Sequence, residues 1–218
     1  MIISHKYKFI FIKTRKTAGT TIEYNLSKYL GNNDIISPSK QANYLSQNYI
    51  QQTRFSKFLT TLKFKNLSKN FYFKFTDHMH AIDIKNKIDK RIYQTYFKFC
   101  VEREPVDKSI SYYFMRKNSP NSNYKRKNMS WIEFVNKKRF PVDTNFYTYN
   151  NRLIIDKIIR YENLETELPL ILHKLGIKDF KIEKSVNNKF RGIDPIITEN
   201  QKKIIYKEFQ SSLKFLDY

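Results

Sequence analysis

The strongest structural constraint in this sequence is a strand-like run that passes directly into a glycine-containing turn and a helical run. Residues 7–13 are rich in aromatic and β-branched side chains, as strands are. Residues 20–30 then place apolar or aromatic side chains at helical spacing, with Thr20 or Thr21 as the expected N-cap and Gly31 as the expected C-cap. A strand, a tight loop and a helix in this order direct free backbone amides at one point, which favours an anion-binding α/β fold.

The rest of the chain continues to alternate between the two kinds of element. We expect strands at 71–76 and 96–102, a β-rich stretch over 147–161, and helices at 81–96, from Pro105, after Ser130 (a capping box with Glu133), at 163–175 (ended by Gly176) and at 198–211 (capped by Thr198). Residues 117–128 are expected to form a loop. The Asn-, Gln- and Ser-rich residues 32–70 are expected to be a mobile insertion with some helix near 41–64, bordering the ligand cleft as a lid.

These elements predict a single domain over residues 1–218. Its fold class is α/β, with a P-loop-like, mostly parallel central sheet flanked by helices. The 7–13 and 96–102 strands are expected to be neighbours, with both carboxyl ends at the ligand.

The net charge favours an anionic ligand but does not identify which one. Lys and Arg number 41 against 20 Asp and Glu, a formal net charge of +21 at pH 7. Such a field attracts phosphate, sulfate, carboxylate or nucleic acid, although many of these lysines are explained equally well as solvated surface residues.

A lone cysteine, Cys100, excludes an intrachain disulfide and a cysteine-based zinc site. No apolar run approaches a membrane span and no secretory cleavage pattern opens the chain, so we expect a soluble, cytoplasmic protein.

The first candidate site is the loop between the first strand and the first helix. Its sequence, from Lys13 to Thr21, is KTRKTAGTT. Gly19 is suited to close backbone approach, Thr20 and Thr21 offer hydroxyl donors, and Lys16 offers a charge. It is not a Walker A motif, because Lys16 precedes the glycine.

The second candidate site follows the 96–102 strand. Arg103 stands at the carboxyl end of that strand, where open α/β sheets bind their ligands, and Ser111 lies about two turns into the next helix. An arginine fork and a hydroxyl donor could share one phosphate. The alternative is that Arg103 pairs with Glu104 or Asp107.

Together the KTAGTT loop and the R-E-P-V-D-K-S-I-S segment resemble the two phosphate-binding signatures of sulfotransferases that use 3′-phosphoadenosine 5′-phosphosulfate (PAPS). Further stretches similar to that family, and to its short carbohydrate-sulfotransferase-like members, are D-H-M-H-A (77–81), R-Y-E-N-L-E (160–165) and N-K-F-R-G (188–192). The resemblance runs from about residue 7 to the C-terminal helix, leaving 32–70 unmatched. Departures are Arg15, where many relatives have Pro, Glu102, where many have Val, and His80, where a small residue is usual.

The resemblance implies sulfuryl transfer from PAPS to an acceptor hydroxyl, with adenosine 3′,5′-bisphosphate (PAP) as the product. Lys16 and His78 would be catalytic, Lys16 at the bridging oxygen and His78 as general base, with His80 as its rival. The residues implied to bind PAPS are Arg15, Lys16, Thr17, Ala18, Gly19, Thr20, Thr21, Arg103, Ser111, Lys189 and Arg191. His5 and His173 are expected to be structural or solvated. No metal is expected. The acceptor is expected to be a carbohydrate, and the excess of lysine would suit an anionic one. A lipid or a small metabolite remains open as the acceptor.

Two other functions stay open at this point. A P-loop nucleotide kinase or NTPase would share the strand–loop–helix start, but the chain lacks the Walker A lysine, and the 96–102 strand offers no terminal Asp for magnesium. A basic nucleic-acid-binding protein would explain the charge but not two phosphate motifs at strand ends.

Overall fold

A mixed five-stranded sheet forms the centre of the computed structural model, which describes residues 1–37, 75–120, 123–183 and 191–216. The strand order is β3–β1–β2–β4–β7. The strands are β1 (Ile2–Ser4), β2 (Phe9–Ile12), β3 (Ile35–Ile36), β4 (Phe97–Glu102) and β7 (Lys157–Arg160). Strands β2, β4 and β7 are parallel, whereas β1 runs antiparallel to both β2 and β3. The predicted α/β class and the pairing of the first predicted strand with β4 are confirmed.

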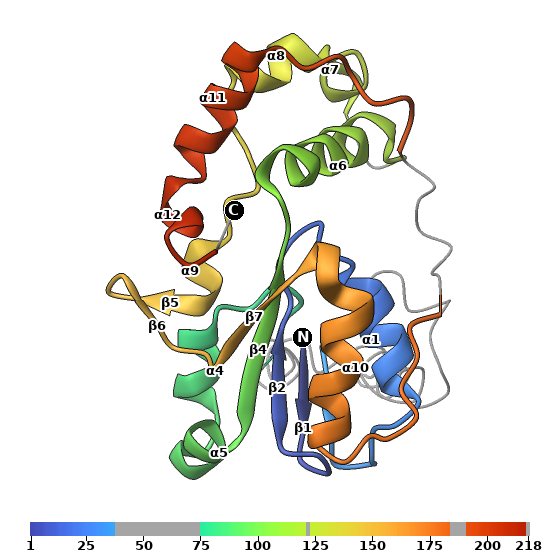
Figure 1. Ribbon diagram of the computed structural model, residues 1–218, viewed down its shortest axis with the longest axis vertical. Helices are drawn as coiled ribbons and strands as arrows, with labels where there is room; N and C mark the ends of the chain where they lie inside the picture. The colour runs from blue at the N-terminus through green and yellow to red at the C-terminus, as the bar shows by residue number, and fades with distance from the viewer. Residues whose placement is uncertain (38–74, 121–122, 184–190, 217–218) are drawn as a thin grey trace, which may run out of the picture.

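Helices cover both faces of the sheet (Figure 1). Along β2, Phe9 and Phe11 face one side and Ile10 and Ile12 the other, and all four are fully buried. The first side packs against α1 (Gly19–Ser27) and α10 (Leu164–Lys174). The second side packs against α4 (Ala81–Lys87), α5 (Lys90–Thr95) and α9 (Thr144–Tyr147). A strand buried on both faces is expected to be a continuous apolar run, which is what residues 9–12 are.

A separate helical layer lies beyond the carboxyl end of β4 (Figure 1). Helix α6 (Pro105–Asn118) packs there against α8 (Trp131–Asn136) and α11 (Glu199–Glu208). The predicted capping boxes at Ser130 and Thr198 are both present. The remaining elements are α7 (Tyr124–Lys127), α12 (Gln210–Leu213), the 3-10 helix η2 (Tyr161–Asn163) and the hairpin β5 (Thr148–Tyr149) and β6 (Arg152–Leu153).

Several predicted boundaries are wrong. Helix α1 is capped by Ala18 in a left-handed conformation, not by Thr20 or Thr21, and it ends at Ser27 rather than near Gly31. The predicted 81–96 helix is two helices, because Ile88 is extended and Asp89 caps a new helix by accepting the Arg91 N–H.

Other differences concern segments between the main elements. Part of the predicted 117–128 loop is helical, since α6 continues to Asn118 and α7 follows. Residues 75–76 are not strand, and residues 71–74 lie outside the described chain, as does most of the expected insertion, including its possible helix and lid. Within the described residues, no helix is both long enough and apolar enough to cross a membrane.

Candidate functional site

The loop from Lys13 to Gly19 connects β2 to α1 in an unusual backbone conformation. Lys16 and Ala18 have φ angles of 62° and 60°, in the left-handed region that residues with side chains rarely adopt. Left-handed residues alternating with right-handed ones turn successive N–H groups to the same side, as in anion-binding nests. The loop is therefore shaped for an anion.

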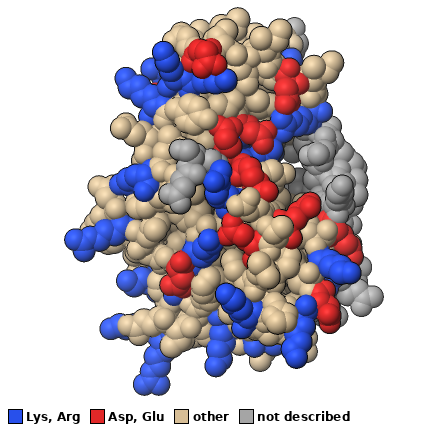
Figure 2. Space-filling model, in the orientation of Figure 1, with Lys and Arg blue, Asp and Glu red and all other residues tan. Residues whose placement is uncertain are grey.

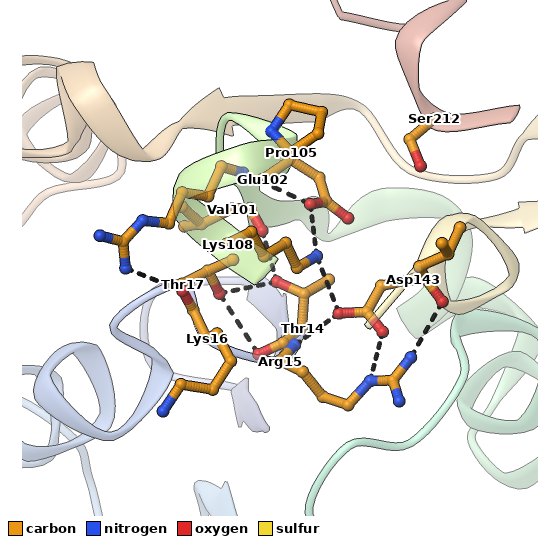
Figure 3. A network of polar contacts seen from close by, with 12 residues as sticks. Thr14, Arg15, Lys16, Thr17, Val101, Glu102, Pro105, Lys108, Asp143 and Ser212 are labelled. Carbon is orange, nitrogen blue, oxygen red and sulfur yellow. Dashed lines mark hydrogen bonds and ion pairs between the residues drawn. The ribbon is translucent and has the colours of Figure 1, made fainter. Parts of the chain in front are cut away.

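The loop is fastened to β4 by Thr14. Its hydroxyl donates to the Val101 carbonyl and lies 2.8 Å from the Thr17 hydroxyl, which is buried. The Thr17 side chain therefore supports the loop from within, and only its backbone amide remains for a ligand. Figure 3 shows these contacts.

Gly19 is required by a neighbouring lysine. A Cβ at this position would lie 2.6 Å from Lys13 Cγ. The Lys13 ammonium is buried and bonds to Glu23 Oε2 at 2.6 Å and Asp77 Oδ1 at 2.9 Å. Gly19 thus makes room for a side chain of the protein itself, a reason that the sequence pattern did not reveal.

The amino end of α1 has no internal cap. Among the residues that the structure describes, no side chain accepts its first N–H groups, and no acidic residue lies in its first turn. The hydroxyls of Thr20 and Thr21, both half-buried, have no hydrogen-bond partner among the described residues. Unsatisfied amides at a positive helix end, next to free hydroxyls, are the features of a candidate anion site.

Lys16 brings a free charge to this end of the helix. Its ammonium has no hydrogen-bond or ion-pair partner within the described part of the chain. Burial, with the nearby Arg103 guanidinium, lowers the pKa of Lys16 to about 8. A partly buried cation without a counter-ion indicates that a ligand supplies the negative charge.

Arg103 lies against the same loop. Its Nη1 donates to the Lys16 carbonyl at 3.3 Å, and its guanidinium lies 4.1 Å from the centre of the Tyr161 ring. Asp107 holds Arg103 from the other side by accepting its Nε–H at 2.6 Å. The pairing with Asp107 that the sequence left open is therefore present, and the two predicted phosphate segments are in contact.

A second arginine joins this cluster from a distant part of the chain. Arg191 Nη1 donates to Asp107 Oδ1 at 2.8 Å, so one carboxylate connects Arg103 and Arg191. The Arg191 loop also packs closely on α6, where a Cβ on Gly192 would lie 3.0 Å from Phe114. Arg191 is also paired with Asp194, which accepts its Nε–H at 2.9 Å and bonds to its Nη2. Carboxylates therefore hold the two guanidiniums together, and paired guanidiniums of this kind are suited to bind a phosphate.

Of the other two predicted phosphate ligands, Ser111 and Lys189, the structure describes only Ser111. Ser111 lies half-buried on α6, with no hydrogen-bond partner for its hydroxyl among the described residues. Lys189 lies outside the described residues.

His78 lies at the surface beside the end of β2. Its Nδ1 is 3.0 Å from the Lys13 carbonyl, and because a carbonyl only accepts, Nδ1 must carry the proton. Nε2 of the neutral ring is then left with a lone pair. Desolvation is the main cause that lowers the pKa of His78, which keeps the ring neutral. A neutral imidazole with a free Nε2 is suited to accept a proton.

His80 is held differently. Its ring packs edge-on against Phe146 at 4.5 Å between centroids, and its Nδ1 lies 4.0 Å from Asp83. It has no contact with the loop comparable to that of His78. Of the remaining histidines, His5 bonds to the Tyr96 hydroxyl at 2.9 Å and His173 is exposed on α10.

Arg15 points away from the loop amides. Its Nε donates to Asp143 Oδ1 at 2.6 Å, its Nη2 donates to the Val142 carbonyl at 2.9 Å, and its guanidinium lies 5.7 Å from the centre of the Phe146 ring. In Figure 3 the Arg15 and Lys16 side chains extend in opposite directions. Arg15 therefore lies on the side of the histidines, not with the phosphate cluster.

The sequence reasoning did not identify several residues that shape the site. These are Glu23, Lys108, Asp143, Phe146 and Tyr161. Tyr161 had a signal, since it belongs to the R-Y-E-N-L-E stretch; the others act through contacts between distant segments. No group of three His, Cys, Asp or Glu residues with metal-site geometry occurs in the described residues.

Comparisons with known proteins agree with this arrangement. A family model described as the sulfotransferase family matches residues 1–204. An uncharacterized protein of Archaeoglobus fulgidus is 32% identical over 123 residues, which cover 53% of this chain and 99% of that protein. No solved structure matches the chain significantly.

Proposed function

Because this chain belongs to the sulfotransferase family, we propose that it transfers a sulfuryl group from PAPS to an acceptor hydroxyl. The observation that carries the proposal is the contact between two anion sites at one end of the sheet. The loop before α1 and the Arg103–Arg191 cluster meet where Arg103 Nη1 donates to the Lys16 carbonyl at 3.3 Å. A nucleotide with a phosphate on each side of its ribose needs two such sites side by side.

In this proposal the loop holds the 5′-phosphosulfate. The free amides at the start of α1 and the Thr20 and Thr21 hydroxyls would bind its oxygens. Arg103, Arg191 and Ser111 would bind the 3′-phosphate, with Asp107 keeping the two guanidiniums together. Tyr161 would fix the plane of Arg103 by stacking.

PAPS supplies an activated sulfuryl group, and the chain supplies charge and proton transfer. Lys16 would stabilise the negative charge that grows on the bridging oxygen as the S–O bond breaks. His78 Nε2 would take the proton of the attacking hydroxyl, with Nδ1–H anchored on the Lys13 carbonyl. Both roles require positioning more than covalent chemistry.

The acceptor is proposed to be a carbohydrate hydroxyl. The support for this is the similarity of the sequence motifs to carbohydrate sulfotransferases. Beside His78 and His80 lie the ring of Phe146 and the guanidinium of Arg15, which is already paired with Asp143. Phe146 itself is largely buried, so its part would be to position the histidines and Arg15 rather than to offer a broad stacking surface.

The test is transfer of radiolabelled sulfuryl from PAPS to a panel of neutral and acidic oligosaccharides, with a lipid alcohol and a small phenol for comparison. Labelled acceptor, with PAP formed in equal amount, is the expected result. Magnesium-dependent hydrolysis of ATP without any transfer from PAPS would instead indicate a nucleotide kinase or NTPase.

A further inference from the structure

Lys108 is a lysine in a place where lysines are rarely found. It lies in the first turns of α6 and its side chain is fully buried. Its ammonium lies 2.6 Å from Glu102 Oε2 and 3.0 Å from Asp143 Oδ2, and both carboxylates are also buried. Burying an ion pair gains little stability over packing apolar groups of the same volume. Stability alone therefore does not account for this arrangement.

The buried ions connect to the phosphate loop through Asp143. Its Oδ2 accepts the backbone N–H of Arg15 at 2.6 Å, and its Oδ1 accepts the Arg15 Nε–H at 2.6 Å. Figure 3 shows a continuous series of contacts from Glu102 through Lys108 and Asp143 to Arg15. The series runs from the residue before Arg103 to the residue before Lys16.

The loop needs such a restraint. Lys16, directly after Arg15, has a φ of 62°, which must be enforced by its surroundings. Thr14 holds the loop on one side through the Val101 carbonyl, and Asp143 holds Arg15 on the other. On the other side of Lys16, the Thr17 hydroxyl donates to the Thr14 carbonyl at 3.2 Å. With the residues before and after Lys16 both held, the direction in which its Cα–Cβ bond leaves the loop is fixed.

We propose that Lys108 is a positioning residue, which with Glu102 and Asp143 locks the phosphate loop in the conformation that presents the Lys16 ammonium. Its effect on turnover rests on the proposed sulfuryl transfer, whereas its effect on Lys16 does not. The ion network also sets the distance between the two anion sites, because Glu102 precedes Arg103 and Lys108 lies on the same helix as Ser111.

A charge-balanced pair of substitutions tests the proposal. Glu102→Gln with Lys108→Met keeps the volumes and leaves Asp143 paired with Arg15. The control is Lys98→Met with Asp156→Asn, which removes the ion pair, 2.8 Å long, between another buried lysine and an exposed carboxylate near the opposite end of β4. Thermal unfolding shows which variants are folded at the assay temperature.

Two readouts follow. The first is the pH midpoint for acylation of Lys16 by acetic anhydride, located by peptide mass spectrometry, which needs no PAPS. We expect it near 8 in the unaltered protein and higher in the Glu102/Lys108 variant, because a released side chain moves into water. The second is single-turnover transfer from PAPS, which should fall by about 100-fold, the cost of misplacing a reacting group by roughly 1 Å. The control should change neither.

An unchanged Lys16 midpoint in the folded double variant would overturn the proposal. If the double variant does not fold, Asp143→Asn is judged by the same midpoint. If the unaltered protein transfers nothing from PAPS, the proposed function fails, and the midpoint still decides whether Lys108 positions Lys16.

Discussion

At the scale of single residues, the free ammonium of Lys16 has the most direct consequence for ligand binding. Its pKa of about 8 means that it loses its proton just above neutral pH in the free protein. A bound phosphate would raise this pKa, since an opposite charge favours the charged form. Binding of PAP must then include uptake of a proton above pH 8.

The first prediction concerns this linkage. The affinity for PAP should be nearly constant between pH 7 and pH 8, above the second pKa of its phosphates at about 6, and should fall as the pH rises further, by up to tenfold per pH unit. Lys16→Ala should bind PAP more weakly at neutral pH and lose this alkaline decline. Calorimetric titrations over a pH series measure both, and an unaltered decline in Lys16→Ala would assign it to another group.

The second prediction separates the two histidines. His78→Ala should cut single-turnover transfer by about 100-fold or more and leave PAP affinity nearly intact, because His78 is assigned to the acceptor proton. His80→Ala is the matched control and should keep most of the rate. If His80→Ala is the inactive variant, the base is His80, and the contact between His78 and the Lys13 carbonyl has only a structural role.

The sequence was enough to predict the site residues whose role follows from their position relative to a strand or helix. Arg103 stands directly after β4 and Lys16 lies in the loop that follows β2, and parallel neighbouring strands bring such positions together. Asp107 was weighed only as a partner of Arg103, because its contact with Arg191 links residues 84 positions apart. Asp143 gave no sequence signal at all, since nothing around it indicates that it reaches Arg15.

At the scale of elements, the helix α1 begins at a different residue, and with a different cap, than the sequence indicates. Thr20 or Thr21 was the expected N-cap, yet the helix begins at Gly19 after a left-handed Ala18. A threonine cap would have satisfied an amide that is instead left free for a ligand. The missing threonine cap thus explains both the wrong helix boundary and the free amides on which the candidate function depends.

The third prediction belongs to this junction. Gly19→Ala should destabilise the protein by about 1–3 kcal/mol, because the new Cβ overlaps the buried Lys13 side chain and overpacking of this kind has that cost. Gly31→Ala is the control, since its Cβ would make only an ordinary contact, 3.7 Å from Lys6. Chemical denaturation of the two variants measures the difference, and equal stabilities would show that Lys13 moves aside freely.

At the scale of the whole molecule, the parallel order β2–β4–β7 gathers the candidate site. Each strand ends beside a residue of the site: Lys13 after β2, Arg103 after β4 and Tyr161 after β7. The gathering of these residues at the carboxyl ends of parallel strands could be predicted from the alternation of strands and helices in the sequence. The antiparallel edge, β1 and β3, could not, because two- and three-residue strands carry too short a pattern to identify.

The net charge of +21 is not concentrated at one place on the face seen in Figure 2. Lys and Arg side chains are spread over that face, with Asp and Glu among them. The charge therefore says less about the ligand than the few cations at the ends of β2 and β4.

The most direct test of the central claim compares PAP with AMP, which lacks the 3′-phosphate, in the unaltered protein and in Arg103→Ala. A charge-assisted contact with phosphate contributes roughly 1.5–3 kcal/mol, so Arg103→Ala should weaken PAP about 10- to 200-fold. AMP affinity should hardly change, and the preference for PAP should largely disappear in the variant. Equal binding of PAP and AMP by the unaltered protein would contradict the assignment of Arg103 and Arg191 to a 3′-phosphate site, and with it the account of this molecule as a PAPS-dependent sulfotransferase.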